Sequence, residues 1–422
     1  MTPFAPDPLF AGLTRYAVGG AVRDALLGRP VKDRDWLIVG ATPQMLLDRG
    51  FKQVGAAFPV FLHPHSGEEC ALARRERKSG PGYTGFETEF GPEVTLEEDL
   101  ARRDLTINAM ALDADGSLID PYGGAQDIQA RRLRHVSDAF AEDPLRLFRL
   151  GRFLARFADL GFAVDPATEA LCGELAASGE LAHLSPERVW RELQLTLEAV
   201  DPAAGIELLA RVGGLDHWLP ELLALQGQTQ PPKYHPEGDA WTHTLLALKS
   251  ICALTPDPVA RFAVLVHDLG KGLTPPELLP SHRGHEISGV PLAEAVCERL
   301  RAPTAYRDLA RLTVRWHLLG HRCAELRPGT VVDLLDSCDA LRKPERFILF
   351  TLCCEADARG RGESGTQTPY VAGEFFRKAL SACLAIDVSE ILARGVQGKA
   401  VGEALRQKRV AVVRELRASM TL

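Results

Sequence analysis

The pattern of apolar residues changes near residue 140, and this change is the strongest constraint on the fold. Before it, short apolar runs bounded by Gly and Pro alternate with a helix-like segment over residues 21–27. From Asp143 onward apolar residues recur every three or four positions, which is the period of an amphipathic helix. We therefore expect an α+β domain followed by an all-α region. The expected strands lie at residues 16–18, 36–39, 60–62 and 109–112.

The chain has 422 residues, more than the ~250–300 that one hydrophobic core usually supports, so two or more domains are expected. Its 46% hydrophobic and 25% charged content exclude disorder as the dominant state. The longest apolar run, residues 347–354, is far shorter than the ~20 residues of a membrane-spanning helix. The N-terminus lacks the pattern of a secretory signal, and the nine cysteines include no CxxC spacing. These features predict a cytoplasmic protein with no membrane segment and no disulfide or zinc framework.

Two adjacent glycines, Gly19 and Gly20, stand between an expected strand and an expected helix. Glycine lets the backbone approach a phosphate closely, and the amides at a helix N-terminus point toward an anion. Arg23, one turn into the helix, adds a guanidinium that can pair with the same phosphate. Because most Gly-Gly pairs are only turns, this pair alone is weak support for a phosphate site.

Asp33 and Asp35 lie two residues apart, directly before the expected strand at 36–39. On a strand such residues point to one face, where two carboxylates repel each other unless a divalent cation binds both. Mg²⁺ held there can bridge nucleotide phosphates and neutralise a leaving pyrophosphate. The alternative is a solvated acidic turn balanced by Lys32 and Arg34. The Gly-Gly turn and its arginine nearby favour the metal site.

Asp143 and Pro144 are typical of a helix start, and a row of arginines at three-residue spacing follows them. Cations beside inward-packing apolar residues are costly unless anionic groups meet them. Cytosine and adenine both present an exocyclic amine beside a ring-nitrogen acceptor, so a carboxylate and a guanidinium can select the two bases together. Asp143 and Arg146 fit those two roles. The row consists of Arg146, Arg149 and Arg152.

Three segments together resemble the class II tRNA nucleotidyltransferase and bacterial poly(A) polymerase family. They are GG-x-VRD-x-LLG-x4-D-x-D at 19–35, RRDLTINA at 102–109 and EDPLR at 142–146. The segment DPYGG at 120–124 is similar to the element that joins head to neck in this family. The segment SPERVWREL at 185–193 resembles the motif PERVWxEL, and we interpret it as a brace for the helix that reads the base.

The resemblance implies a polymerase β-like head with a mixed sheet, followed by a helical neck, body and tail. It implies that Asp33 and Asp35 bind Mg²⁺ and are catalytic. It also implies that Asp143 and Arg146 form a protein template for CTP and ATP. The nucleotide-binding residues expected from it are Gly20, Arg23, Arg103, Asp143, Arg146, Arg149 and Arg152.

The second half of the chain carries histidines whose spacing suits a metal site, beginning with His243 and the adjacent pair His267-Asp268. A lone buried histidine is usually a satisfied core residue. Burying a His-Asp pair beside three apolar residues is unfavourable unless both groups are paired or coordinated. The auxiliary candidates are Lys271, placed to hold a phosphate, and the histidines His285 and His317.

This arrangement resembles the HD metal-dependent phosphohydrolase superfamily. The resemblance implies a divalent transition metal such as Ni²⁺, and phosphatase, 2′-nucleotidase or 2′,3′-cyclic phosphodiesterase activity. Its ligands would be His243, His267, Asp268 and a distal acid. For that acid we choose Asp357 over Asp333 and Asp339. Leu318 follows His317 where similar proteins often carry an acidic residue, which weakens a catalytic role for His317.

The polar segment at 226–232 ends in two prolines and is the best boundary within the helical region. We expect a head at 1–140, a neck and body at 141–225, an HD domain at 233–345 and a helical tail at 346–422. The leading interpretation is an enzyme that adds C, C and A to the 3′ end of tRNA from CTP and ATP. Alternatives are a poly(A) polymerase, a CC-only or A-only enzyme, an HD phosphohydrolase with a regulatory head, and a non-catalytic tRNA-binding protein. A monomer and a homodimer are both compatible with the sequence.

The formal net charge is −7, from 49 Lys and Arg against 56 Asp and Glu, and taken alone it argues against a nucleic-acid partner. The arginines, however, gather in the expected head and neck. The total therefore does not exclude RNA, and we expect tRNA to meet a local basic cleft that recognises its shape and backbone. The clusters lie at residues 74–77, 102–103, 131–134 and 146–156.

Overall fold

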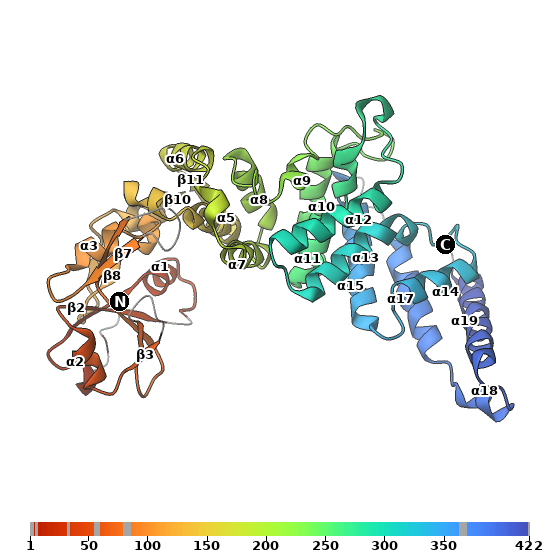
Figure 1. Cartoon of the computed structure of the whole chain (residues 1–422), viewed down its shortest axis with the longest axis horizontal. Coiled ribbons are helices and arrows are strands. Elements are labelled where there is room, and N and C mark those ends of the chain that lie inside the picture. The colour runs from red at the N-terminus through yellow and green to blue at the C-terminus, as the bar shows by residue number, and fades with distance from the viewer. Residues whose placement is uncertain are drawn as a thin grey trace. The chain divides into compact units, whose positions relative to one another are not determined.

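The structure is a computed structural model. It describes Phe4 and residues 7–31, 34–54, 60–78, 86–362 and 369–420. For residues 76–78 and 86–88 it describes the backbone only. The chain divides into two compact units. The first comprises Met1–Val189 and Arg211–Gly214, and the second Trp190–Ala210 and Leu215–Leu422. In Figure 1 the first unit runs from red through yellow and the second from green to blue.

A mixed sheet forms the base of the first unit, and its described strands lie in the order β3-β4-β5-β2-β1-β8-β9. β2 and β5 run parallel, and the other neighbouring pairs run antiparallel. Two smaller pairs, β6 with β7 and β10 with β11, lie outside this sheet. The strands are β1 (Thr14–Val18), β2 (Asp35–Val39), β3 (Lys52–Val54), β4 (Val60–Leu62), β5 (Glu69–Leu72), β6 (Arg74–Lys78), β7 (Phe86–Phe90), β8 (Ala111–Leu112), β9 (Leu118–Ile119), β10 (Arg132–Leu133) and β11 (Ala163–Val164).

The register of β1 and β2 brings the Gly-Gly turn to Asp35. Val18, the last residue of β1, pairs with Asp35, the first residue of β2. Gly19 follows at once as the N-cap of helix α1 (Gly20–Leu26), with a φ of 66° that favours glycine. The turn and the carboxylate, 16 residues apart in the chain, therefore meet at one edge of the sheet because of strand pairing alone.

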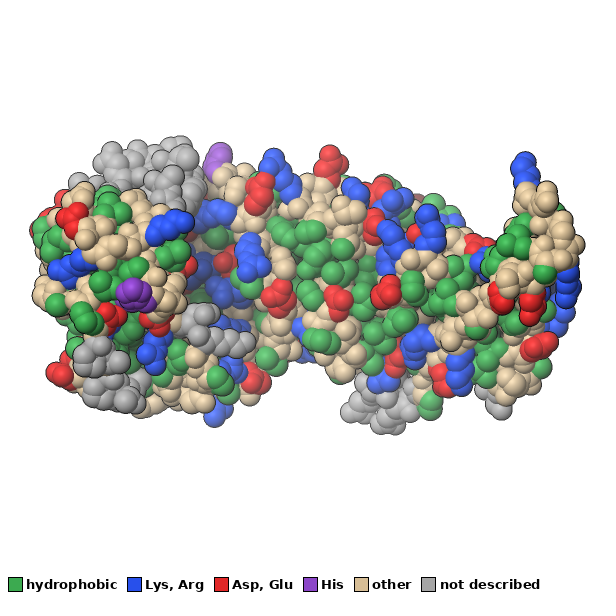
Figure 2. Space-filling view, turned by 90° about the horizontal axis from the view of Figure 1, so that it is seen from below, with side chains coloured by type: hydrophobic (Ala, Val, Ile, Leu, Met, Phe, Trp, Pro, Cys, Tyr) green, Lys and Arg blue, Asp and Glu red, His purple; other side chains and the backbone are tan. Residues whose placement is uncertain are grey.

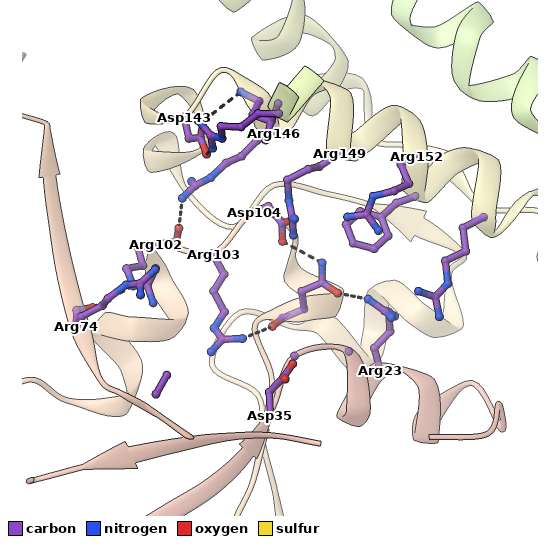
Figure 3. A pocket seen from close by; sticks show the side chains of 18 residues that line it. Arg23, Asp35, Arg74, Arg102, Arg103, Asp104, Asp143, Arg146, Arg149 and Arg152 are labelled. Carbon is purple, nitrogen blue, oxygen red and sulfur yellow. Dashed lines mark hydrogen bonds and ion pairs between the residues drawn. The ribbon is translucent and has the colours of Figure 1, made fainter. Parts of the chain in front are cut away.

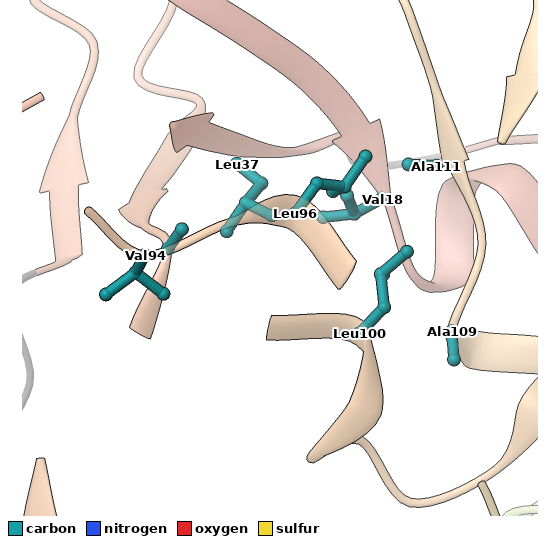
Figure 4. Packing of buried hydrophobic residues seen from close by; sticks show 8 residues of the cluster. Val18, Leu37, Val94, Leu96, Leu100, Ala109 and Ala111 are labelled. Carbon is teal, nitrogen blue, oxygen red and sulfur yellow. The ribbon is translucent and has the colours of Figure 1, made fainter. Parts of the chain in front are cut away.

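A hydrophobic cluster beside strands β1 and β2 holds helix α3 (Leu96–Ala101) in place (Figure 4). Helix α3 supplies Leu96 and Leu100, and a capping box between Thr95 and Glu98 starts the helix. A fully buried leucine contributes about 1.5–3 kcal/mol, so this packing holds α3, and the two arginines after it, against the sheet. The cluster consists of Val18, Leu37, Ala73, Val94, Leu96, Leu100, Ala109 and Ala111.

Helix α5 (Leu145–Arg156) carries the arginine row and buries Phe148, Leu150 and Phe153 beside it. Asp143 is extended, and its Oδ1 accepts a hydrogen bond from the Leu145 amide at 3.2 Å. The Asp143 carboxylate thus binds an amide of the first turn, but the N-cap residue of α5 is Pro144, one position later than predicted. The other helices that begin in the first unit are α2 (Pro43–Leu47), α4 (Gly124–Gln129), α6 (Pro166–Ala177) and α7 (Pro186–Leu197).

The described residues of the second unit form helices joined by turns and loops, with one isolated β-bridge between Thr229 and Asp239. Helices α11, α13 and α15 pack against one another, α10 packs against α11 and α15, and α12 packs against α13. Helix α19 packs on α14 and α17 at the C-terminal end. No helix in the described part of the chain is long and apolar enough to cross a bilayer. The helices are α8 (Pro202–Arg211), whose last residue belongs to the first unit, α9 (Pro220–Leu223), α10 (Ala240–Leu254), α11 (Pro258–Leu265), α12 (His285–Arg299), α13 (Thr304–Gly320), α14 (Pro328–Ser337), α15 (Pro344–Arg359), α17 (Val371–Leu384), α18 (Ser389–Ala393) and α19 (Lys399–Ser419).

The predicted α+β head with helices after it is confirmed, and the strands expected at 16–18, 36–39 and 60–62 are present. The strand expected at 109–112 is shorter and covers only Ala111–Leu112. The reason is a 3₁₀ turn at Thr106–Asn108, after which the Ala109 amide donates to the Thr106 carbonyl instead of a neighbouring strand. The polar segment at 226–232 lies inside the second unit.

Candidate functional site

A pocket of about 580 Å³ opens beside the Gly-Gly turn in the first unit (Figure 3). Its walls carry nine arginines but only three aspartates, which are Asp35, Asp104 and Asp143. Such an excess of guanidinium groups suits a bound polyanion, because guanidinium pairs with phosphate in a two-pronged geometry. The arginines are Arg23, Arg74, Arg102, Arg103, Arg146, Arg149, Arg152, Arg156 and Arg188.

Gly19 lies where a larger residue would crowd the pocket. A Cβ atom there would stand 3.1 Å from Nη1 of Arg103 and 3.9 Å from Oδ2 of Asp35. The backbone, a guanidinium and a carboxylate thus converge at one point. Asp35 is exposed at this edge and offers the hard oxygen ligands that Mg²⁺ prefers, so it fits a divalent cation. Asp33, the second predicted ligand, lies outside the described residues.

Asp99, which the sequence did not single out, holds two pocket arginines. Its side chain is fully buried and pairs with Nη2 of Arg102 at 2.6 Å and Nη2 of Arg103 at 3.0 Å. It also accepts a hydrogen bond from the Arg74 amide at 3.3 Å. Burial alone would raise the pKa of Asp99, but the two guanidinium groups outweigh burial and lower it. The carboxylate is therefore charged at neutral pH and fixes where Arg103 stands.

Asp104 ties the head to the arginine row. Its Oδ2 pairs with Nη2 of Arg149 at 2.7 Å, and its Oδ1 accepts from the Asn108 amide at 2.9 Å. Asn108 in turn accepts a hydrogen bond from Nη1 of Arg23 at 2.5 Å. Burial opposes ionisation of Asp104, yet the Arg149 guanidinium holds the pKa of that carboxyl well below its usual range. One chain of contacts therefore links α1, the segment after α3, and α5.

Arg146 and Asp143 line the pocket but also make firm protein contacts. The guanidinium of Arg146 donates to the carbonyls of Ala139 and Arg102, at 2.6 Å each. Asp143 Oδ2 pairs with Nη2 of Arg188 at 2.9 Å, so the SPERVWREL segment touches the base of α5, as its interpretation as a brace requires. The protein itself supplies a carboxylate for Arg149 and carbonyl acceptors for Arg146. The arginine row alone is therefore not sufficient evidence for a bound nucleotide.

Charge is unevenly distributed over the surface. In Figure 2, blue side chains gather in the hollow at the left, whereas blue and red side chains are interspersed over the rest of that face. The nine arginines that line the pocket are also a local excess of positive charge within a chain whose net charge is −7. A basic cleft on an acidic protein is thus present, as the arginine clusters predicted.

A second cluster lies among the helices of the other unit. His243 stands on α10, the His267-Asp268 pair lies just beyond the C-cap of α11, and Asp357 stands on α15. Nε2 of His243 lies 3.1 Å from Oδ1 of Asp357 and 3.9 Å from Oδ2 of Asp268. Nε2 of His267 lies 3.1 Å from Oδ2 of Asp268 and 4.0 Å from Oδ2 of Asp357. Four side chains from three separate segments therefore surround one buried point.

The two rival acids lie elsewhere. Asp333 pairs with Arg406 at 2.6 Å, and Asp339 pairs with Arg342 at 2.6 Å. Asp357 is instead joined by His321, whose Nε2 lies 2.7 Å from Oδ2. Burial alone would raise the pKa of Asp357, but His321 and His243 lower it well below its usual range.

The donor set fits a divalent transition metal. The ligand atoms of His243, His267 and Asp268 all lie within 4.8 Å of one another. Nε2 of His267 and both carboxylate oxygens of Asp268 are buried and make no well-formed hydrogen bond with any described residue, although charged partners lie as close as 2.5 Å. A buried polar atom without a well-formed hydrogen bond needs an explanation, and a cation bound between these side chains would supply one.

The auxiliary residues surround Asp268. Nε2 of His285 lies 3.2 Å from Oδ1 of Asp268, and Nε2 of His317 lies 3.7 Å from the same oxygen. Burial lowers the pKa of His317 to about 3, so its ring is neutral at pH 7. Lys271 was expected to hold a phosphate, but its Nζ pairs with Oδ2 of Asp268 at 2.5 Å and donates to Oε1 of Gln230 at 2.6 Å.

Comparison with known proteins decides the family. Residues 15–134 match the family described as "Poly A polymerase head domain", residues 161–225 a "Probable RNA and SrmB- binding site of polymerase A", and residues 240–341 the HD domain. The "Multifunctional CCA protein" of Hahella chejuensis is 53% identical over 96% of both chains. That of Halorhodospira halophila is 55% identical over 96% of this chain and 97% of its own. The chain belongs to the family of multifunctional CCA proteins.

Solved structures resemble this chain in fold. The Bacillus stearothermophilus CCA-adding enzyme in complex with CTP is 25% identical and covers 97% of this chain and 94% of its own, with a TM-score of 0.64. A CCA-adding enzyme in its apo form II reaches a TM-score of 0.66 at 21% identity, over 97% of this chain and 92% of its own. Head and HD domains are both metal-dependent, and the described residues offer candidate ligands in each.

Some residues of this CCA-family chain that surround the two sites were not among the predicted site residues. Asp99 and Asn108 order arginines in the head, and Glu237 and His321 contact the ligands His243 and Asp357. Only Asn108 lies within a segment that the sequence marked. For Glu237 a signal was available, because it stands six residues before the first expected metal ligand in HPEGDAWTH.

Proposed function

We propose that this chain adds C, C and A in turn to the 3′ end of tRNA, using CTP and ATP and releasing pyrophosphate. The observation that carries the proposal is the convergence of Gly19, Arg103 and Asp35 in a pocket lined by nine arginines. The full-length likeness to relatives named for CCA supports tRNA as the acceptor. The RNA-binding match over residues 161–225 supports the same acceptor.

The roles follow from the contacts. Asp35, together with Asp33, would hold Mg²⁺, which supplies polarisation of the nucleotide α-phosphate and neutralisation of the pyrophosphate. Gly20, Arg23 and Arg103 bind the triphosphate and ribose, and the Asp99 carboxylate keeps Arg103 in place. Holding the tRNA 3′-hydroxyl and the α-phosphate together in one pocket removes most of the entropic cost of their encounter.

Base selection is assigned to Asp143 and Arg146, with Arg149 and Arg152 beside the base or phosphates. The edges shared by cytosine and adenine need one acceptor and one donor, which a carboxylate and a guanidinium provide. The contacts of Arg146 to two carbonyls and of Asp143 to Arg188 support this role, because they hold both groups rigidly. A rigid pair discriminates better than a mobile one.

The proposal is tested with tRNA that lacks its 3′-terminal CCA, incubated with CTP alone, ATP alone or both. We expect CTP alone to extend the tRNA by two nucleotides, and both together to extend it by three and then stop. ATP alone should add nothing to this acceptor. Long A tracts would instead indicate a poly(A) polymerase, and a stop after CC with both nucleotides would indicate a partial enzyme.

Arg146→Lys is expected to lower the ratio of CTP to UTP incorporation by about 10- to 100-fold, because a bidentate base contact provides about 1–3 kcal/mol of discrimination. Lysine keeps the charge but not the planar fork. The measurement is kcat/KM for each of the four nucleotides in single-nucleotide addition. Arg156→Lys, which keeps a charge near Asp24 at another place in the pocket wall, is the matched control. An unchanged CTP to UTP ratio in Arg146→Lys would contradict the assignment.

Salt is expected to weaken tRNA binding strongly despite the negative net charge. If the basic cleft contacts three to four phosphates, the affinity should fall by about 10- to 100-fold between about 50 mM and about 200 mM KCl. Filter binding with deacylated tRNA over this range measures how the logarithm of the affinity depends on the logarithm of the salt concentration. A flat salt dependence would mean that the cleft does not bind the RNA backbone.

We also propose a second activity, metal-dependent phosphohydrolysis at the HD cluster, with His243, His267, Asp268 and Asp357 as ligands of a transition metal such as Ni²⁺. The buried, poorly hydrogen-bonded atoms of His267 and Asp268 support this proposal. Phosphatase, 2′-nucleotidase and 2′,3′-cyclic phosphodiesterase reactions all hydrolyse a phosphoryl ester, and a bound metal ion can activate the attacking water. The domain organisation that we propose with these two activities is a catalytic head at 1–140, a neck and body at 141–225, the HD domain at 233–345 and a tail at 346–422.

A further inference from the structure

Glu237 is a buried carboxylate just before helix α10, and the assigned reactions give it no part. Its side chain is 2% exposed, and its Oε1 lies 2.8 Å from Nδ1 of His235 and 2.7 Å from Nδ1 of His243. The turn that carries it is well defined, since the Gly238 amide donates to the His235 carbonyl and Asp239 caps α10. Glu237 and His243 therefore belong to one rigid piece of the chain.

The contact with Glu237 fixes how His243 can be used. An ionised carboxylate only accepts hydrogen bonds, so Nδ1 of His243 must carry a proton. The lone pair available to a metal is then on Nε2, and this atom faces the oxygens of Asp357 and Asp268 at 3.1 Å and 3.9 Å. Metal-binding histidines commonly donate their other N–H to a carboxylate, which orients the ring and makes it a stronger ligand.

We propose that Glu237 is a positioning residue of the HD metal site, which holds His243 with Nε2 directed at the space shared with His267, Asp268 and Asp357. The inference rests on the proposed metal-dependent activity of that cluster. The nearby atoms of His235, Glu237 and His243 could also be thought to bind a metal of their own, since they lie within 4.8 Å of one another. That arrangement is disfavoured because the His243 ring would then have to bridge two cations.

The test measures Co²⁺ binding to the full-length, metal-stripped protein, by titration and by the visible spectrum of the bound ion. Glu237→Met removes the acceptor at nearly constant volume, whereas Glu237→Gln keeps an acceptor oxygen and loses the charge. His235→Ala removes the other partner of Glu237. His267→Ala removes a proposed ligand outright. The matched control is Glu221→Gln, which makes the same chemical change at the ion pair with Arg299 in the same unit.

We expect Glu237→Met to weaken Co²⁺ affinity by about 10- to 100-fold and to alter the spectrum of the bound ion. Glu237→Gln should have an intermediate effect. The number of ions bound per chain should be unchanged in both variants. His235→Ala and Glu221→Gln should bind like the wild type. Wild-type affinity and spectrum in Glu237→Met would overturn the proposal. If that variant does not fold, the same result in Glu237→Gln overturns it.

Two further outcomes separate the possible errors. Loss of one bound ion in His235→Ala would mean that His235, Glu237 and His243 form a metal site of their own, and the positioning role would be wrong. Unchanged Co²⁺ binding in His267→Ala would mean that the HD cluster is not the metal site, which overturns the proposed second activity itself. If His267→Ala loses Co²⁺ binding as expected but the Glu237 variants bind Co²⁺ like the wild type, only the role given to Glu237 is rejected.

Discussion

Asp35→Ala, alone or with Asp33→Ala, is expected to lower nucleotide incorporation at least about a thousandfold. The carboxylates would hold Mg²⁺ against the triphosphate, and losing several kcal/mol of transition-state stabilisation corresponds to three or more orders of magnitude in rate. Asp35 is exposed at the sheet edge, so its removal should leave the fold of the head intact. Single-turnover addition of CMP to tRNA that lacks CCA is the measurement.

The same variant separates the two proposed sites. Hydrolysis of a 2′,3′-cyclic nucleotide in the presence of Ni²⁺ should continue, because the HD ligands all belong to the other unit. Asp48→Ala, which removes another exposed aspartate of the head at the end of α2, is the control and should keep full incorporation. Loss of both activities in Asp35→Ala would contradict the picture of two independent sites. Retained incorporation would contradict the assignment of the metal ligands.

Local patterns were sufficient to predict the elements that carry the first site. Strand β2 follows from the apolar run after Asp35, and the Gly-Gly turn predicts both the end of β1 and the start of α1. The start of α5 was predictable to within one residue because Asp143 followed by Pro144 is typical of a helix start. Each of these features depends on residues within a few positions of one another, and such signals are visible in a single sequence.

The partners of the arginines could not be predicted in the same way. Asp104 and Arg149 are 45 residues apart, and only the packing of the head against α5 brings them together. The arginine row therefore looked uncompensated in the sequence, although one of its members has a buried carboxylate as partner. Asp99 was hidden for a related reason, since its neighbours are two more acids in an ordinary helix start and nothing in the sequence marks it as buried.

Asp357 was the preferred distal acid of the second cluster, but no local pattern separates it from its two rivals. All three candidates are aspartates, namely Asp333, Asp339 and Asp357, and their distances along the chain from the histidines do not favour any one of them. The packing of α15 against α10 brings Asp357 to the ring of His243, while the other two acids pair with arginines. His321 adds a second contact to Asp357, and it lies beyond the end of α13, where the helical period gives no guide.

The largest effect in the second unit is expected from the pair His267→Ala and Asp268→Asn. Together they should abolish Ni²⁺-dependent phosphohydrolase activity, by about a thousandfold or more, because two ligands of the metal are lost. Asparagine is chosen at position 268 because Lys271 is buried against that carboxylate at 2.5 Å, and removing its partner entirely would leave a buried charge at a cost of about 3–5 kcal/mol. Asparagine keeps an oxygen for the ammonium group but is a poor metal ligand.

Nucleotide addition should be nearly unaffected by this pair of substitutions, since every residue that lines the arginine pocket belongs to the first unit. Metal content by atomic spectroscopy and hydrolysis of p-nitrophenyl phosphate with Ni²⁺ are the two measurements, and both should fall together. His217→Ala, an exposed histidine of the same unit, is the control for non-specific metal binding. Loss of metal with unchanged hydrolysis would mean that the activity arises elsewhere. Unchanged metal would mean that His267 and Asp268 are buried for another reason.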